Sequence, residues 1–106
     1  MAVKSEIYEQ ILKDCFWGYK FNEEKIRNLS KSSDFAEKKF LFGKILVNST
    51  EVLSALGIFK FKDLKKLIED FKVPEFNHDF IFKRKNMAEV FFLDKPLLIE
   101  ELQWLA

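Results

Sequence analysis

Residues 34–71, DFAEKKFLFGKILVNSTEVLSALGIFKFKDLKKLIEDF, predict the centre of an α-helical domain. In the first part of this stretch, apolar side chains fall on every side of a short helical segment. They are Phe40, Leu41, Phe42, Ile45, Leu46 and Val47. A helix that is apolar on all sides must be covered on all sides, so we expect this one at the centre of a bundle.

The end of the same stretch predicts a surface helix that packs on the central one. Phe61, Leu64, Ile68 and Phe71 recur at i, i+3, i+7 and i+10, which is the apolar stripe of an amphipathic helix. This helix should stop before Pro74, because the residue that precedes a proline disfavours helical geometry.

Two capping patterns predict where the helices of this stretch begin. Asp34 with Glu37 has the spacing of a capping box, and Asn48 with Glu51 repeats it. We therefore expect a break close to Asn48, followed by a short helix with Gly57 at its C-terminal cap.

The two ends of the chain predict further helices. A first helix should run from Ser5 to about Cys15, and Asn22 should cap a short second one. Residues 80–93 are either one helix or two strands around a turn at 83–86. The helix is favoured, because Met87-Ala88-Glu89 is poor strand material. Asp94-Lys95-Pro96 predicts a closing helix with Leu98, Ile99, Leu102 and Leu105 on one face.

Composition agrees with an all-α fold in one compact domain, residues 1–106, a bundle of roughly five to seven helices. Apolar residues make up 48% of the chain, charged residues 33%, and the net charge is +1, which is typical of a globular protein. No third of the sequence has the basic excess of a general nucleic-acid or membrane binder. A single cysteine and the lack of a long apolar run predict a soluble cytoplasmic protein without a membrane segment.

The sequence carries no pattern typical of a catalytic or metal site. Cys15 and His78 are the only residues of their types, and no neighbouring residue suggests that they form a nucleophile pair. Adjacent carboxylates such as Glu23-Glu24 point about 100° apart on a helix, so they do not converge on one atom. We therefore expect no enzyme activity, no bound metal and no cofactor.

The aromatic residues suggest a protein-binding role instead. The chain has 13 Phe but only two Tyr and two Trp. Phe has no polar group, so most of these side chains should form a Phe-rich core and the rest a contact surface. Aromatic residues in irregular or terminal segments are the candidate anchors for a protein partner or a second copy of the chain. They are Trp17, Tyr19, Phe82, Phe92 and Trp104.

A second hypothesis is a DNA-binding regulator with a helix-turn-helix-like element at residues 49–71. The candidate phosphate contacts are Lys60, Lys62, Lys65 and Lys66, with the basic cluster Lys83, Arg84 and Lys85. The first group shares its helix with Asp63, Glu69 and Asp70, and that helix lacks Arg, Asn or Gln for reading bases. We therefore favour the protein partner over nucleic acid.

A resemblance to a known group supports this preference. The segment Phe16-Trp17-x-Tyr19-x-Phe21, then Lys44-Ile45-Leu46 and residues 63–69, resembles small α-helical proteins encoded beside abortive-infection-type nucleotidyltransferases. The resemblance implies an antitoxin-like partner of a nucleotidyltransferase, and it brings no catalytic residue. The function we expect is a small interaction module that covers a surface of its partner.

Overall fold

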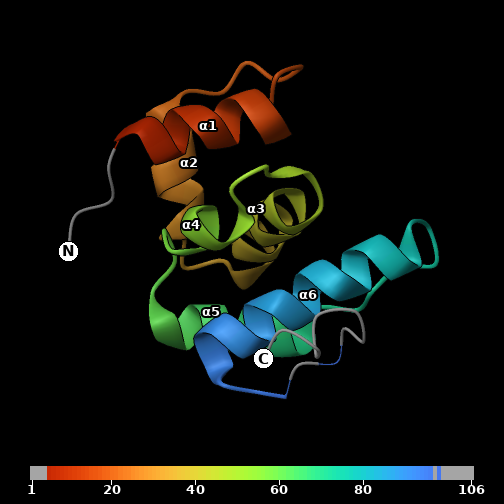
Figure 1. Cartoon of the computed structure of the whole chain (residues 1–106). Coiled ribbons are helices and arrows are strands. Elements are labelled where there is room, and N and C mark those ends of the chain that lie inside the picture. The colour runs from red at the N-terminus through yellow and green to blue at the C-terminus, as the bar shows by residue number, and fades with distance from the viewer. Residues whose placement is uncertain (1–4, 97, 99–106) are drawn as a thin grey trace.

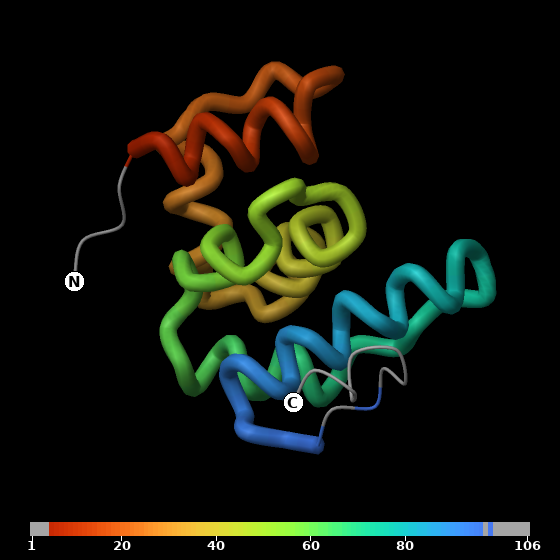
Figure 2. The backbone as a smooth tube through the Cα atoms, viewed as in Figure 1, coloured from red at the N-terminus to blue at the C-terminus, as the bar shows by residue number. Residues whose placement is uncertain are grey.

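A computed structural model describes residues 5–96 and residue 98 as a layered arrangement of helices (Figures 1 and 2). In this part of the chain the helices are α1 (Ser5–Cys15), α2 (Glu23–Ser30), α3 (Phe35–Asn48), α4 (Val52–Leu56), α5 (Phe61–Asp70) and α6 (His78–Leu93). Figure 1 shows α1 and α2 on one side of α3 and α4, with α5 and α6 on the other. The predicted all-α fold is confirmed. Among the described residues, none of these helices is long and apolar enough to cross a lipid bilayer.

The central position of α3 is confirmed. This helix contacts each of the other five described helices, and Leu41, Phe42, Ile45 and Leu46 are almost fully buried. The expectation of complete cover is wrong at Phe40, which is 41% exposed. One face of α3 therefore reaches solvent, and it does so beside the loop that joins α1 to α2.

Local capping explains where α2 and α3 begin. Asn22 accepts a hydrogen bond from the Lys25 backbone N–H at 2.9 Å, and Asp34 accepts one from the Ala36 N–H at 3.0 Å. The predicted return contact from Glu37 to the Asp34 N–H is replaced by a bridge through Ser32. That hydroxyl accepts from the Asp34 N–H and donates to Glu37.

The predicted capping role of Asn48 is wrong. Asn48 is the last residue of α3, and its amide donates back to the Lys44 carbonyl at 3.2 Å. The turn into α4 is held by the neighbouring Ser49, whose hydroxyl oxygen accepts from the Glu51 N–H at 3.1 Å. The break itself and the cap at Gly57 lie where the sequence predicted them.

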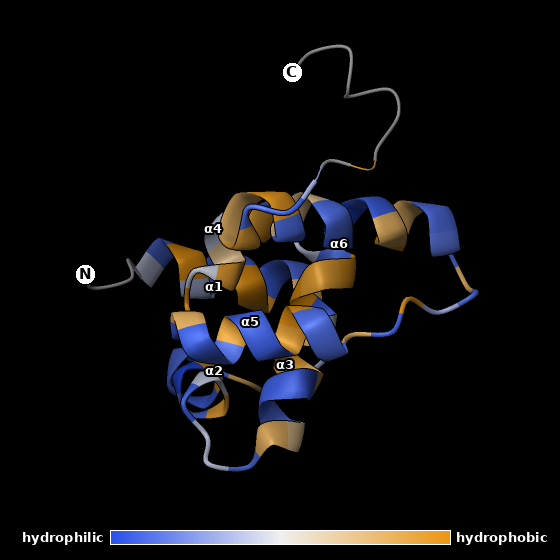
Figure 3. Cartoon of the chain, turned by 90° about the horizontal axis from the view of Figure 1, so that it is seen from below, coloured by the Kyte–Doolittle hydropathy of each residue, from blue (hydrophilic) through white to orange (hydrophobic). Residues whose placement is uncertain are grey.

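The surface helix α5 has the predicted stripe with one exception. Leu64, Leu67 and Ile68 are buried, and Figure 3 shows α5 alternating between hydrophilic and hydrophobic segments. Phe61, the first residue of the helix, is 60% exposed. Phe71 packs against Phe42, with ring centroids 5.7 Å apart.

Residues 78–93 form one helix, so the favoured prediction for this segment is confirmed and the hairpin alternative is wrong. Asp94 ends α6 with a left-handed backbone (φ 54°) instead of beginning a new helix. The remainder of the predicted closing helix falls mainly on residues 97 and 99–106, outside the described part of the chain.

The core uses fewer phenylalanines than expected. Three are buried: Phe16, Phe42 and Phe59. Four more are partly buried against this core: Phe21, Phe35, Phe71 and Phe92. Five are exposed: Phe40, Phe61, Phe76, Phe80 and Phe91. The surface is thus richer in aromatic rings than the sequence suggested.

Candidate interaction surfaces

The five predicted anchor residues do not form one patch. Trp17 and Tyr19 are exposed in the loop between α1 and α2. Phe82 and Phe92 are half-buried on α6, which lies on the other side of α3 (Figure 1). Trp104 lies outside the described residues. The structure therefore keeps only Trp17 and Tyr19 as neighbouring exposed anchors.

Tyr19 and Phe40 both lie near the Lys44 ammonium, and Trp17 precedes them in the same loop as Tyr19, so these residues define one candidate surface. It consists of Trp17, Tyr19, Phe40 and Lys44, and we call it the aromatic–lysine surface. Trp17 is 86% exposed, the most open of the exposed large hydrophobic side chains in the described part of the chain. The Lys44 ammonium lies 5.3 Å from the Tyr19 ring centre and 6.0 Å from that of Phe40, so it links the loop to α3.

The buried ring of Phe16 holds this surface in place. It lies edge-on to Tyr19 with centroids 5.2 Å apart, and it also packs on Phe21 at 5.1 Å and Phe40 at 5.9 Å. The Tyr19 N–H donates to the Phe16 carbonyl at 2.8 Å, which closes a tight turn. The rings of Tyr19 and Phe40 are therefore held on a buried base, which lowers the entropy lost when they bind a partner.

The charge around the aromatic–lysine surface is mainly positive. Lys20 is exposed between Tyr19 and Phe21, and the Lys25 ammonium lies 5.6 Å from the Phe21 ring centre. The carboxylates nearest to these lysines in sequence are Glu23 and Glu24. Glu23 is neutralised by Arg27 at 2.9 Å, whereas Glu24 is exposed. This surface therefore suits a partner that combines apolar and acidic groups.

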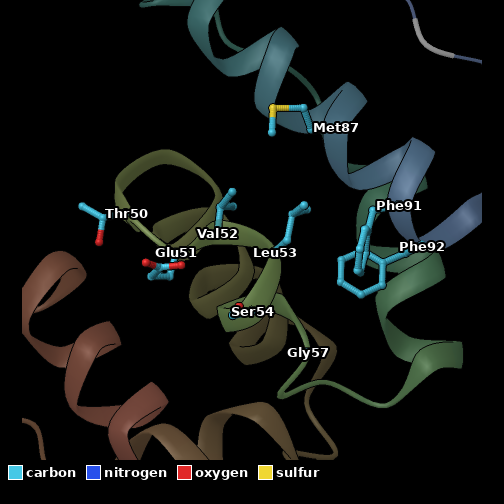
Figure 4. Close-up of a pocket in the computed structure, with 9 residues that line it drawn as sticks. All are labelled: Thr50, Glu51, Val52, Leu53, Ser54, Gly57, Met87, Phe91 and Phe92. Carbon is cyan, nitrogen blue, oxygen red and sulfur yellow. The ribbon is translucent and has the colours of Figure 1, made fainter. Parts of the chain in front are cut away.

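A second apolar surface lies between α4 and α6 (Figure 4). This α4–α6 groove has a volume of about 590 Å³. Its lining includes Val52 and Leu53, which point from α4 toward α6, and Met87, Phe91 and Phe92 on α6. Phe91 is 64% exposed and lies edge-on to Phe92, with centroids 4.8 Å apart.

The basic cluster at residues 83–85 is not the predicted turn, because all three residues lie within α6. The Arg84 guanidinium donates to the backbone carbonyls of Leu46 and Ser49 at the C-terminal end of α3. Desolvation by burial lowers the pKa of Arg84. Arg84 thus caps a helix instead of presenting its charge to a phosphate. Lys83 forms an ion pair with Asp79 at 3.4 Å.

The lysines of the helix-turn-helix hypothesis are all exposed: Lys60, Lys62, Lys65 and Lys66. The last three share one side of α5, and Lys66 lies 4.7 Å from the Phe35 ring centre. The neighbouring Asp63 is neutralised by Lys38 on α3, at 2.9 Å. The preceding helix, α4, has only five residues, which is short for the supporting helix of a helix-turn-helix motif.

Cys15 and His78 lie in different environments. Cys15 is buried at the end of α1, and desolvation, with a smaller effect of Asp14, raises the pKa of its thiol to about 12. His78 is exposed at the start of α6, where its ring stacks on Phe82 at 6.2 Å. Within residues 5–96 and 98, the His, Cys, Asp and Glu side chains form no group of three or more that could hold a metal ion.

Sequence reasoning did not find the roles of three residues. Phe40 was assigned to the core, Arg84 was assigned to a nucleic-acid site, and Phe91 was given no role. The i, i+4 spacing of the apolar residues Met87 and Phe91 on α6 is a local signal that could have indicated a groove. No family profile, curated protein or solved structure matches the chain.

Proposed function

We propose that the protein is a non-enzymatic interaction module whose aromatic–lysine surface binds an acidic, partly apolar surface on another protein. The observation that carries the proposal is the 86% exposure of Trp17 beside two further exposed rings. Trp and Tyr are the residues that most often dominate the energy of a protein interface. Lone exposed apolar residues are ordinary, but an exposed Trp in the same loop as a Tyr that packs with Phe40 on a buried ring is typical of a contact site.

The lysines support the choice of partner chemistry. Lys20, Lys25 and Lys44 border the rings and leave a positive rim around an apolar centre. Such a rim accelerates encounter with an acidic surface and disfavours basic ones. The resemblance noted from the sequence directs the first search to a nucleotidyltransferase, whose surface the module would cover in the manner of an antitoxin.

The test is affinity capture from native lysate with three forms of the full chain: the parent, Trp17→Ala and Phe61→Ala. Phe61 is the matched control, because it is an exposed aromatic residue on α5, away from the aromatic–lysine surface. We expect a stoichiometric protein that the parent and Phe61→Ala retain after nuclease treatment and that Trp17→Ala loses. Equal recovery by all three forms would contradict the proposal.

A second candidate function is binding of a nucleic-acid backbone by α5. The observation that favours it is the exposure of Lys62, Lys65 and Lys66 on α5 and of Lys60 directly before it. Lysines without a base-reading side chain contact phosphates only, so this binding would be independent of sequence and would weaken steeply with salt. Recovery of nucleic acid that nuclease or high salt removes, in all three forms alike, would favour this candidate.

A further inference from the structure

A pocket with a volume of about 330 Å³ lies between α3 and the end of α5. Its apolar lining consists of Phe42 and Leu67, which are both 1% exposed, and the half-buried Phe71. The Phe71 ring lies edge-on to the Phe42 ring, with centroids 5.7 Å apart. This α3–α5 pocket therefore has an apolar floor, and its volume is at the lower end of the range of small-molecule sites.

The rim of the α3–α5 pocket is charged. Lys39 on α3, Asp70 at the end of α5 and Lys72 just after that helix complete the lining, and all three are exposed. None of these three side chains forms an ion pair with another residue of the described part of the chain. Two lysines and one carboxylate leave the rim with one net positive charge.

A neighbouring ring brings a further positive charge close to this rim. The Lys39 ammonium lies 5.3 Å from the ring centre of Phe35, and the Lys66 ammonium of α5 lies 4.7 Å from the same point. The two ammonium groups are thus no farther apart than the sum of these distances, about 10 Å, which is about one Debye length at roughly 0.1 M salt. Asp63, one turn before Lys66, does not offset this charge, because it is paired with Lys38 at 2.9 Å.

We propose that the α3–α5 pocket binds a small amphiphilic monoanion, a carboxylate that carries an apolar body. The apolar body packs on Phe42, Leu67 and Phe71, and the carboxylate lies at the rim with Lys39 and Lys72. Charge complementarity favours this class of ligand. A neutral apolar molecule leaves both ammonium groups without a partner, a cation is repelled by them, and an anion without an apolar body gains nothing from the lining.

Three small probes test the proposal on the full chain. Octanoate has both the charge and the chain, acetate has the charge alone, and octanol has the chain alone. Each is titrated into isotopically labelled protein, below the concentration at which octanoate forms micelles, and the amide chemical shifts report both the affinity and the place of binding. We expect octanoate to bind most tightly and to shift the amides of Phe42, Leu67 and Phe71 most strongly.

Two results of these titrations would overturn the proposal. One is an affinity for octanol or acetate equal to that for octanoate, because the site would then not recognise charge and apolar body together. The other is a set of octanoate-induced shifts centred on the α4–α6 groove, which would place the binding site on the wrong side of the central layer.

Charge variants then assign the contact to the rim. The double variant Lys39→Gln with Lys72→Gln should weaken octanoate binding by about five- to tenfold, because two ion pairs are lost. Its matched control, Lys62→Gln with Lys65→Gln, removes the same charge from exposed positions of α5 outside the lining and should change the affinity by less than about twofold. Asp70→Asn removes the like charge from the rim and should strengthen binding by about two- to threefold.

The affinity for octanol should stay the same in all these variants, since the apolar lining is intact. Equal weakening of octanoate binding by the two double variants would overturn the proposal, because the total charge of the protein would then govern binding. Weaker octanoate binding by Asp70→Asn would overturn it as well.

Discussion

Arg84 shows how one side chain can join two parts of the fold. Its guanidinium donates to Leu46 and Ser49, whose carbonyls end α3 and have no partner within that helix. Arg84→Met removes both bonds and leaves these carbonyls unsatisfied. We expect a loss of about 2–3 kcal/mol in the free energy of unfolding, measured with urea. Lys85→Met, one residue along α6, is the control and should change stability by less than about 0.5 kcal/mol. Equal losses in the two variants would refute the capping role.

Cys15 gives the protein a predictable response to alkaline pH. Burial raises the pKa of this thiol to about 12 from its ordinary value of 9.0, so between these values the native state keeps a proton that the unfolded chain releases. Stability is therefore complete below about pH 9 and falls as the pH rises, by up to about 1.4 kcal/mol per pH unit from this group. Cys15→Ala removes this contribution, while the other titrating groups stay the same.

The measurement for Cys15 is the difference between the parent and Cys15→Ala in the free energy of unfolding, from pH 8 upward. We expect the two curves to converge above about pH 9, since only the parent loses the thiol contribution. Parallel curves across this range would show that the thiol ionises equally in the native and unfolded states.

At the scale of the elements, Asn86 holds the segment after α6 against that helix. Asn86→Leu preserves the side-chain volume but leaves the Pro96 carbonyl and the Leu98 N–H without their partner. We expect a loss of about 1–3 kcal/mol in stability and faster hydrogen exchange at the Leu98 amide. Glu89→Gln retains an acceptor for the Asn86 amide and should exchange like the parent. Unchanged protection of Leu98 in Asn86→Leu would exclude this role.

The elements also show what could be predicted from sequence. The starts of α2 and α3 were predictable because Asn22 and Asp34 cap them through bonds to residues two or three positions away. The role of Arg84 was not, because its acceptors lie 38 and 35 residues distant. Phe40 was placed in the core for a similar reason: a helix's own pattern does not say which of its faces a neighbour leaves open. The aromatic–lysine surface was predictable only at Trp17 and Tyr19, which share one loop.

At the scale of the whole molecule, the central layer of α3 and α4 separates two candidate binding faces (Figure 1). The aromatic–lysine surface is on the side of α1 and α2, and the exposed lysines of α5 are on the other side. Each face has a lysine whose charge can be reversed by substitution. On the first face it is Lys44, which lies near the rings of both Tyr19 and Phe40, and on the second it is Lys62, which is exposed on α5. Lys44→Glu and Lys62→Glu change the net charge equally, so any difference between them depends on position.

This pair of variants separates the two functions by binding measurements at several salt concentrations. If the protein partner binds the aromatic–lysine surface, Lys44→Glu should weaken its affinity by about tenfold or more, through repulsion of the acidic partner, and Lys62→Glu should leave it unchanged. For a nucleic-acid duplex, Lys62→Glu should weaken the affinity and Lys44→Glu should leave it unchanged. Lys62→Glu should also reduce the slope of log affinity against log salt concentration by about the value of one phosphate contact. Equal effects of both variants on the protein partner would mean that net charge alone governs binding, and the proposed surface would then be wrong.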